Sequence, residues 1–205
     1  MLPKVSVIVP YNKNRGWLYD CIWSIVTQDY EGEIEILLSK SGERVGTNIN
    51  RAVQKATGQF VKFIPEDDML TPNCIRESVS GIGQFDVIHG NAYYIENGSI
   101  VRMAIPQKKS FGLGDMLSKN YVHGGTLFFK RDVLLNEPFD ESLWTAEEYE
   151  LNLRLLKKGF TFGYVDAFMT YNRLHGLQKS IGNKAIEYQR TRMKEIERIK
   201  RMYWL

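Results

Sequence analysis

The sequence has few cysteines and no long apolar run, and both absences restrict the classes of protein it can belong to. Its 205 residues include only two cysteines, Cys21 and Cys74, and these lack the spacing of a metal site or a disulfide framework. We expect both to be buried, reduced thiols of an intracellular protein. No apolar run approaches the roughly 18 residues that cross a bilayer. The N-terminus leads directly into a predicted strand, so we expect no signal peptide and a cytoplasmic location.

Strong charge and biased composition are also absent. The net charge of +3 is too small to indicate a nucleic-acid partner by itself. Hydrophobic residues make up 43% and charged residues 25% of the chain, which is typical of a globular protein. There is no internal repeat and no low-complexity segment. The chain is most simply one domain that is large enough to bury a core.

Strand and helix patterns alternate from the N-terminus. Residues 4–10 form an apolar, β-branched run that ends at a proline, which is typical of a strand buried on both faces. Residues 33–38 and 59–64 are predicted to be the second and third strands. Residues 17–28, between the first and second strands, and residues 46–56, between the second and third, carry apolar side chains at helical spacing and are predicted to be helices. This order predicts an α/β fold with a mainly parallel central sheet flanked by helices.

The rest of the chain is predicted to add further strands and helices. A Thr-Pro pair at residues 71 and 72 predicts the start of a helix that runs to about residue 81. Glu96, Asn97 and Gly98 predict a hairpin between two strands. The other expected elements are a short helix at residues 111–117, a strand after two glycines within residues 123–130, an amphipathic helix at residues 145–158, a strand at residues 160–171 and a basic helix at residues 183–205.

Two groups of carboxylates stand out. Glu66, Asp67 and Asp68 directly follow the third predicted strand, where α/β sheets bind ligands. Such close carboxylates repel one another unless a solvated turn or a divalent cation reduces the repulsion. The cluster is therefore either a polar turn that ends the strand or a metal site. Glu147 and Glu148 lie in the first turn of a predicted helix, where the helix dipole favours negative charge. Alternatively, one of them is a general base within reach of an acceptor hydroxyl.

Seven motifs occur in a recognisable order along the chain. They lie at residues 5–10, 21–30, 34–38, 56–72, 124–134, 139–141 and 147–159. Together they resemble glycosyltransferase family 2, the inverting enzymes of the GT-A fold, over residues 3–181. The resemblance implies a GT-A domain in residues 1–182, with a nucleotide-sugar-binding half (1–105) and an acceptor and catalytic half (106–182). A separate basic helix would follow in residues 183–205.

The resemblance implies metal-dependent, inverting transfer of a sugar from a nucleotide diphosphate, with a UDP-sugar as the expected donor. Asp67, Asp68 and His175 are the implied ligands of Mn2+ or Mg2+, which would neutralise the leaving diphosphate. Glu148 is the implied catalytic base, with Glu147 as its orienting neighbour.

The resemblance also implies residues that contact the substrates. The expected nucleotide-sugar-binding residues are Pro10, Tyr11, Asn12, Arg15, Ser39, Asn48, Asn50 and Glu66. The expected sugar and acceptor pocket consists of His123, Gly124, Gly125 and Trp144.

The chain departs from the family pattern at Glu148, where the family has an aspartate one methylene shorter, and in two further places. Pro65 stands where the family has the first aspartate of its metal motif, so Glu66 with Asp68 is an alternative pair. Residues 39–42 lack the aspartates that read uracil in the family. These two further departures favour a rival interpretation, a non-catalytic nucleotide-sugar-binding protein. A nucleotidyltransferase is disfavoured because no glycine-rich phosphate loop follows the first strand.

The C-terminal segment is basic. Residues 184–201 contain seven basic and three acidic side chains, and Ile186, Met193, Ile196 and Tyr203 give the predicted helix an apolar face. The simplest interpretation is a helix that packs on the domain. Alternatively, it lies on an anionic membrane near a lipid-linked acceptor, or it follows a DNA backbone to a hydroxylated base. We expect a glycan or lipid-linked glycan acceptor rather than nucleic acid, because no base-recognition motif is present.

Overall fold

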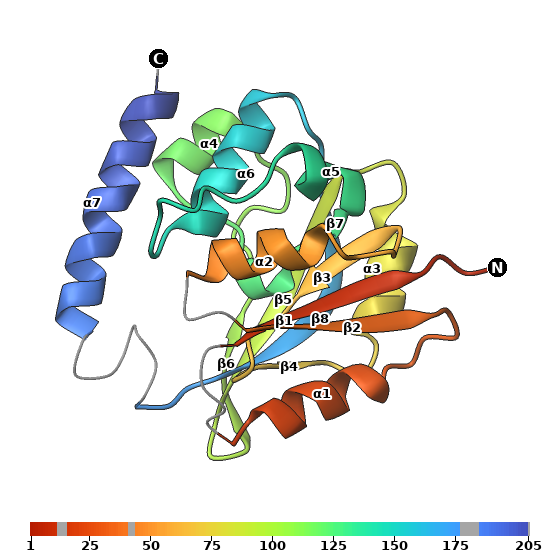
Figure 1. Ribbon diagram of the computed structural model, residues 1–205. Helices are drawn as coiled ribbons and strands as arrows, with labels where there is room; N and C mark the ends of the chain where they lie inside the picture. Colours follow the sequence, from red (N-terminus) through yellow and green to blue (C-terminus); the bar gives the residue numbers. More distant parts are fainter. Residues whose placement is uncertain (12–15, 41–43, 177–184, 205) are drawn as a thin grey trace.

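Helices cover both faces of one central sheet (Figure 1). The computed structural model describes residues 1–11, 16–40, 44–176 and 185–204. The strands are β1 (Val5–Tyr11), β2 (Ile34–Lys40), β3 (Phe60–Phe63), β4 (Met69–Leu70), β5 (Val87–Glu96), β6 (Ser99–Ala104), β7 (Phe128–Lys130) and β8 (Phe162–Arg173). The helices are α1 (Leu18–Val26), α2 (Val45–Val53), α3 (Cys74–Ile82), α4 (Leu113–Ser118), α5 (Arg131–Asn136), α6 (Glu147–Lys157) and α7 (Ala185–Tyr203), with a 3-10 turn η1 (Gly124–Thr126).

The sheet is mixed: its longest ladders, β1–β2 and β5–β8, are parallel, in line with the predicted mainly parallel sheet, and shorter antiparallel pairings join them. Its strand order is β2-β1-β3-β7-β5-β8-β4, and β6 pairs with β5. Only β1–β2, β1–β3 and β5–β8 are parallel among the described pairings. The other pairings are antiparallel: β7 lies between β3 and β5 and runs against both, β6 returns from β5 through a hairpin, and the short strand β4 runs against β8.

The predicted hairpin is confirmed between β5 and β6. Asn97 and Gly98 have φ angles of 50° and 81° at its tip. Two consecutive positive φ angles are typical of a type I′ turn, whose twist matches that of the strands, and Asn-Gly is the pair that adopts it most readily.

The apolar run of β1 is buried because each face of the sheet has its own core. Val5, Val7 and Val9 pack with residues of α1 and α3 on one face. Ile8, on the opposite side of the strand, packs with the core formed by α2, α5 and α6. Cys21 in α1 is a buried free thiol, as predicted, and so is Cys74 in α3.

The predicted start of α3 at residues 71 and 72 is wrong by two residues. The Thr71 hydroxyl donates to the Phe168 carbonyl at 2.5 Å, so it is turned toward β8 and does not cap the helix. Leu70, just before it, pairs with Thr170 in the short strand β4. The sequence also gave no indication of β4 or α5, which are only two and six residues long.

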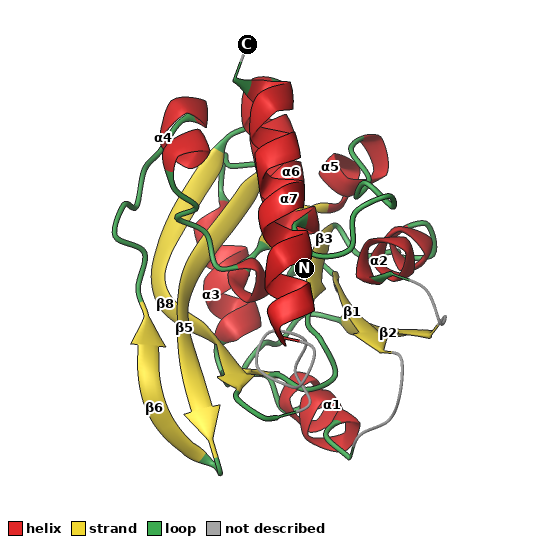
Figure 2. Ribbon diagram, turned by 90° about the vertical axis from the view of Figure 1, so that its left-hand side faces the viewer, coloured by secondary structure: helices red, strands yellow, loops and turns green. Residues whose placement is uncertain are grey.

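The predicted basic helix is present as α7, which lies at the outer edge of the molecule (Figures 1 and 2). It packs alongside α6, and Ile199 is its fully buried side chain. None of the helices in the described part of the chain is long and apolar enough to cross a membrane.

Candidate active site

One cleft of about 560 Å³ gathers most of the residues predicted to be functional. It lies at the carboxyl ends of β1 and β3 and at the start of α6. The predicted residues that line it are Pro10, Tyr11, Asn48, Glu66, Asp67, Asp68, His123, Gly124, Gly125, Trp144, Glu147 and Glu148.

The acidic cluster after β3 occupies a tight turn on the cleft wall. The Asp68 amide donates to the Pro65 carbonyl at 3.1 Å, which closes the turn. The interpretation as a polar turn is therefore correct for the backbone, while Glu66 and both aspartates line the cleft. Beneath the turn, the Cys21 thiol lies 3.6 Å from the Pro65 carbonyl oxygen. Burial, and then the nearby carboxylates, raise the pKa of Cys21 to about 12, so it is an unreactive thiol.

Asp67 contacts His175, which lies 108 residues later in the sequence. The His175 Nε2 lies 3.0 Å from the Asp67 Oδ2, and the histidine ring packs on Trp17 with ring centroids 4.1 Å apart. Asp68 instead accepts the backbone N–H of Arg173 at 2.8 Å. Burial, and then the adjacent Asp67 charge, raise the pKa of Asp68 well above its usual value. A cation at this turn would relieve the repulsion between the two carboxylates.

The donor set at this turn fits a divalent cation only in partnership with a phosphate ligand. Among the described residues, no three His, Cys, Asp or Glu side chains gather as a metal site. Asp67 and His175 nevertheless supply two adjacent donors, and Asp67 lines the cleft. Mg2+ is commonly held by one or two carboxylates while substrate phosphates and water complete its shell. Of the three predicted ligands, Asp67 and His175 are in contact, whereas Asp68 is bonded to the Arg173 backbone, and their metal-binding role remains a prediction.

Glu148 lies against the glycine pair of η1. A Cβ placed on Gly124 would lie 3.1 Å from the Glu148 Oε1 and 3.2 Å from its Cδ, so a glycine is what allows this position of the carboxylate. Glu147, the first residue of α6, is only 7% exposed, whereas Glu148 is partly exposed to the cleft. Of the two glutamates, Glu148 is thus the more exposed to the cleft, and its role as catalytic base stays a prediction.

Lys62 is a buried cation below the cleft floor that sequence reasoning missed. Its side chain is fully buried in β3, and Nζ donates to the carbonyls of Gly125 and Leu127, the latter at 3.1 Å. Burial lowers the pKa of Lys62 to about 8, although the Cys74 and Asp68 groups oppose the shift. The available signal was a lone lysine inside an apolar run predicted to be a strand, because a lysine buried in such a run needs partners.

His123 forms part of the cleft wall as a neutral side chain. Its Nε2 lies 3.0 Å from the Tyr94 hydroxyl oxygen. Burial, and then the Lys62 and Arg102 charges, lower the pKa of His123 to about 4. Because it is uncharged near neutral pH, His123 contributes hydrogen bonding rather than positive charge.

Two predicted residues are turned away from the cleft. The Asn50 amide donates to the Phe139 carbonyl at 3.0 Å and to Glu141 at 2.9 Å, and Asn50 Oδ1 accepts the Phe139 N–H at 2.9 Å. Asn50 therefore joins α2 to the segment before α6, which corrects its expected position beside a diphosphate. The Ser39 hydroxyl donates to the Asn48 carbonyl at 2.8 Å and is not among the lining residues. Asn12 and Arg15 lie outside the described residues.

Helix α7 supplies part of the cleft wall, which sequence reasoning also missed. Tyr188 and Arg192 line the cleft near Trp144 and Thr145. The Arg192 guanidinium donates to the Thr145 carbonyl at 3.1 Å. Burial raises the pKa of Tyr188, so its hydroxyl stays protonated near neutral pH. The C-terminal helix therefore belongs to the site as well as to the surface.

Among curated proteins, the chain is similar to several that are named glycosyltransferases, although no family model matches it. It is 23% identical to an uncharacterized glycosyltransferase of Rickettsia felis over 87% of this chain and 35% of that protein. It is 24% identical to the uncharacterized glycosyltransferase MJ1057 of Methanocaldococcus jannaschii over 84% of this chain and 71% of that protein. It is 28% identical to the UDP-Glc:alpha-D-GlcNAc-diphosphoundecaprenol beta-1,3-glucosyltransferase WfgD of Escherichia coli over 62% of this chain and 50% of that protein. The chain thus spans about a third of the length of the Rickettsia relative and half of WfgD.

Solved structures of TarS from S. aureus share the fold. The TarS 1-349 complex with UDP-GlcNAc superposes with a TM-score of 0.68 at 19% identity, over 85% of this chain and 60% of TarS. The complex with UDP gives a TM-score of 0.69 at 17% identity, over 96% and 64% of the two chains. These matches confirm the predicted α/β glycosyltransferase fold, with a central sheet flanked by helices.

Proposed function

We propose that this protein is an inverting glycosyltransferase of family 2 that moves a sugar from a UDP-sugar to a hydroxyl of a glycan or lipid-linked glycan. The observation that carries the proposal is that a single cleft brings together the Asp67 carboxylate, which His175 contacts from behind the lining residues, and the Glu148 carboxylate. Asp67 follows β3, His175 follows β8 and Glu148 lies in the first turn of α6, and the family resemblance assigned them complementary roles. The names of the curated relatives and the nucleotide complexes of TarS support the same reaction class.

The donor would lie with its nucleoside near β1 and α2 and its diphosphate near the acidic turn. Pro10, Tyr11 and Asn48 line the β1 end of the cleft, where the nucleoside would bind. Asp67 and His175 would hold Mn2+ or Mg2+. When bound, such an ion offsets the negative charge of the leaving diphosphate.

Glu148 would act on the acceptor. Its carboxylate takes the proton of the acceptor hydroxyl while the hydroxyl oxygen attacks the anomeric carbon of the sugar. The bond from that carbon to the diphosphate oxygen breaks, and UDP leaves from the opposite face, so the configuration inverts. Contact with Gly124 fixes the carboxylate, and the more deeply buried Glu147 supports the first turn of α6.

A binding screen followed by a turnover assay tests this proposal. At about one hundred times its Kd, a nucleotide stabilises the folded state by about 2.7 kcal/mol, which for this size raises Tm by roughly 5–10 °C. We expect a shift of that order for UDP with Mn2+, and smaller shifts for UDP with EDTA and for ADP with Mn2+. UDP-sugars should then release UDP on turnover. Absence of any UDP shift would overturn the proposal, and UDP binding without turnover would favour the non-catalytic rival.

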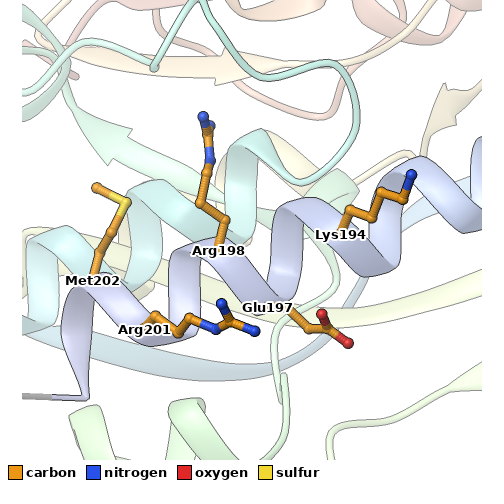
Figure 3. A pocket seen from close by; sticks show the side chains of 5 residues that line it. All are labelled: Lys194, Glu197, Arg198, Arg201 and Met202. Atoms are coloured by element: carbon orange, nitrogen blue, oxygen red, sulfur yellow. The ribbon is translucent and has the colours of Figure 1, made fainter.

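We propose further that the outer face of α7 contacts an anionic lipid surface. Ile186, Met193 and Trp204 are 70%, 63% and 68% exposed, and their spacing of 7 and 11 residues puts them on one side of the helix. Basic side chains accompany them. A surface hollow of about 450 Å³ on this helix is lined by Lys194, Glu197, Arg198, Arg201 and Met202 (Figure 3). Exposed apolar residues flanked by basic ones are typical of helices that lie in a membrane interface.

Vesicle sedimentation tests the contact. The protein should sediment with vesicles that contain phosphatidylglycerol and much less with pure phosphatidylcholine vesicles, because the basic residues need anionic headgroups. The double variant Met193→Ser, Trp204→Ser should lose this binding. Ile100→Ser, at a comparably exposed position on β6, should keep it. Equal binding by the double variant and the control would contradict the contact.

A further inference from the structure

A carboxylate of α7 holds the chain at the entrance to α6. The Glu195 Oε1 accepts the Trp144 N–H at 2.8 Å. Its Oε2 accepts the Thr145 N–H at 2.9 Å, the Thr145 hydroxyl at 2.7 Å and the Ala146 N–H at 3.3 Å. One side chain thus accepts three consecutive backbone N–H groups, from a helix that packs against α6.

These bonds anchor the segment that precedes α6, a helix that has no side-chain cap of its own. The N-cap of α6 is Ala146, and no side-chain hydrogen bond caps this helix from its own segment. Alanine is a poor N-cap because it offers no acceptor to the N–H groups at a helix start. Glu195 provides an acceptor for the segment that leads into α6, and bonds from N–H groups to an ionised carboxylate are stronger than those between neutral groups.

Two further contacts fix the orientation of this junction. Arg192, one turn before Glu195 on α7, donates to the Thr145 carbonyl at 3.1 Å. Near the other end of α7, the Tyr203 hydroxyl donates to the Glu150 Oε1 at 2.6 Å. Residue 145 is therefore held through its N–H, its hydroxyl and its carbonyl at once. Glu148 follows three residues later, in the first turn of α6.

We infer that Glu195 is a positioning residue for sugar transfer, acting on Glu148 through residues 144–146. The inference rests on the proposed function. If Glu195 is lost, the first turn of α6 keeps its intrahelical bonds but loses its external anchor, so the Glu148 carboxylate is held less closely against Gly124 and the acceptor. The nucleotide end of the cleft, at β1, α2 and the turn after β3, lies on other elements and keeps its geometry.

The test compares Glu195→Ala and Glu195→Gln with Glu187→Ala, which removes an exposed glutamate from the same helix. Three quantities are measured: kcat and donor KM for transfer, the Kd for UDP, and hydrogen exchange of the amides at residues 144–146. Misplacing a reacting group by about 1 Å can lower a rate a hundredfold. Loss of Glu195 should shift the Glu148 carboxylate by less than that, so we expect about a tenfold loss of kcat. For Glu195→Ala we expect that loss, faster exchange at residues 144–146, and donor KM and UDP Kd within about twofold of wild type. Glutamine keeps one acceptor oxygen, so Glu195→Gln should recover part of kcat. Glu187→Ala should match wild type.

Two results would overturn the inference. One is faster exchange at residues 144–146 with an unchanged kcat, which would mean that the anchor does not affect the reaction. The other is a parallel fall of kcat, UDP affinity and Tm, which would mean that Glu195 only stabilises the fold. If wild-type protein turns over no UDP-sugar, the proposed function fails and this role in transfer fails with it. Hydrogen exchange at residues 144–146 needs no activity. It would therefore still show whether Glu195 anchors this segment, even if the proposed function fails.

Discussion

Replacing Lys62 by methionine should change how the stability of the protein depends on pH. Lys62 is fully buried, and burial lowers the pKa of its amine to about 8 from a usual value of 10.5. Methionine has a similar length and fills the same space without a titrating group. The variant therefore isolates the contribution of one buried amine.

The direction of the effect follows from proton binding. Below about pH 8 the amine is charged in both states, and the folded state carries the full cost of burying it. Between about pH 8 and 10.5 the unfolded chain still binds the proton while the folded chain has lost it, so the free energy of unfolding rises with pH. A difference of about 2.5 pKa units corresponds to a rise of about 3 kcal/mol. Above that range the cost has disappeared.

Urea unfolding at a series of pH values measures this rise. Tyrosines and other lysines titrate in the same range, so the informative quantity is the free energy of unfolding of the wild type minus that of Lys62→Met. This difference should increase by about 3 kcal/mol from pH 7.5 to pH 10.5. Lys130→Met, which removes an amine that is only partly buried on the neighbouring strand β7, should give a nearly flat difference. A flat difference for Lys62 as well would refute the account of a buried, destabilised charge below the cleft.

Two further variants test the geometry of the site. Gly124→Ala places a methyl group 3.1 Å from the Glu148 Oε1 and should reduce kcat by several-fold to about tenfold, because it displaces the carboxylate by a few tenths of an ångström. Gly114→Ala, whose added methyl group meets nothing within 4 Å, should leave kcat unchanged, and equal rates for the two variants would contradict the contact. Asn50→Ala removes hydrogen bonds to Phe139 and should lower the free energy of unfolding by about 1–2 kcal/mol without changing UDP affinity. A loss of UDP affinity at unchanged stability would instead restore Asn50 to the diphosphate site.

The sequence allowed the fold class to be predicted because the buried strands are locally unambiguous. The apolar runs of β1 and β3 and the Asn97–Gly98 turn carry their own structural preference. The antiparallel entry of β7 was not predictable from such signals. Its three residues pair with β3 and β5 through contacts distant in sequence, and no local pattern encodes the direction of a strand.

The candidate site was predictable where a motif places a side chain directly at the end of a strand or helix. Asp67, Asp68 and Glu148 belong to this group, and all three line the cleft. The contributions of Arg192 and Glu195 were not predictable, because they depend on how α7 packs against α6. A charged helix of this kind is compatible with many docked positions, so its sequence indicated only a basic surface.

The central claim is that Asp67 and Glu148 belong to one nucleotide-sugar transfer site with separate roles. The most direct measurement is UDP release from UDP-sugars in Mn2+, together with UDP affinity, for wild type, Asp67→Asn and Glu148→Gln. We predict turnover by wild type. Asp67→Asn should lose the Mn2+-dependent part of UDP affinity. Glu148→Gln should bind UDP normally but turn over about a hundredfold or more slowly, which is the usual contribution of a general base. Full turnover by Glu148→Gln, or Mn2+-dependent UDP binding that Asp67→Asn leaves intact, would contradict the account.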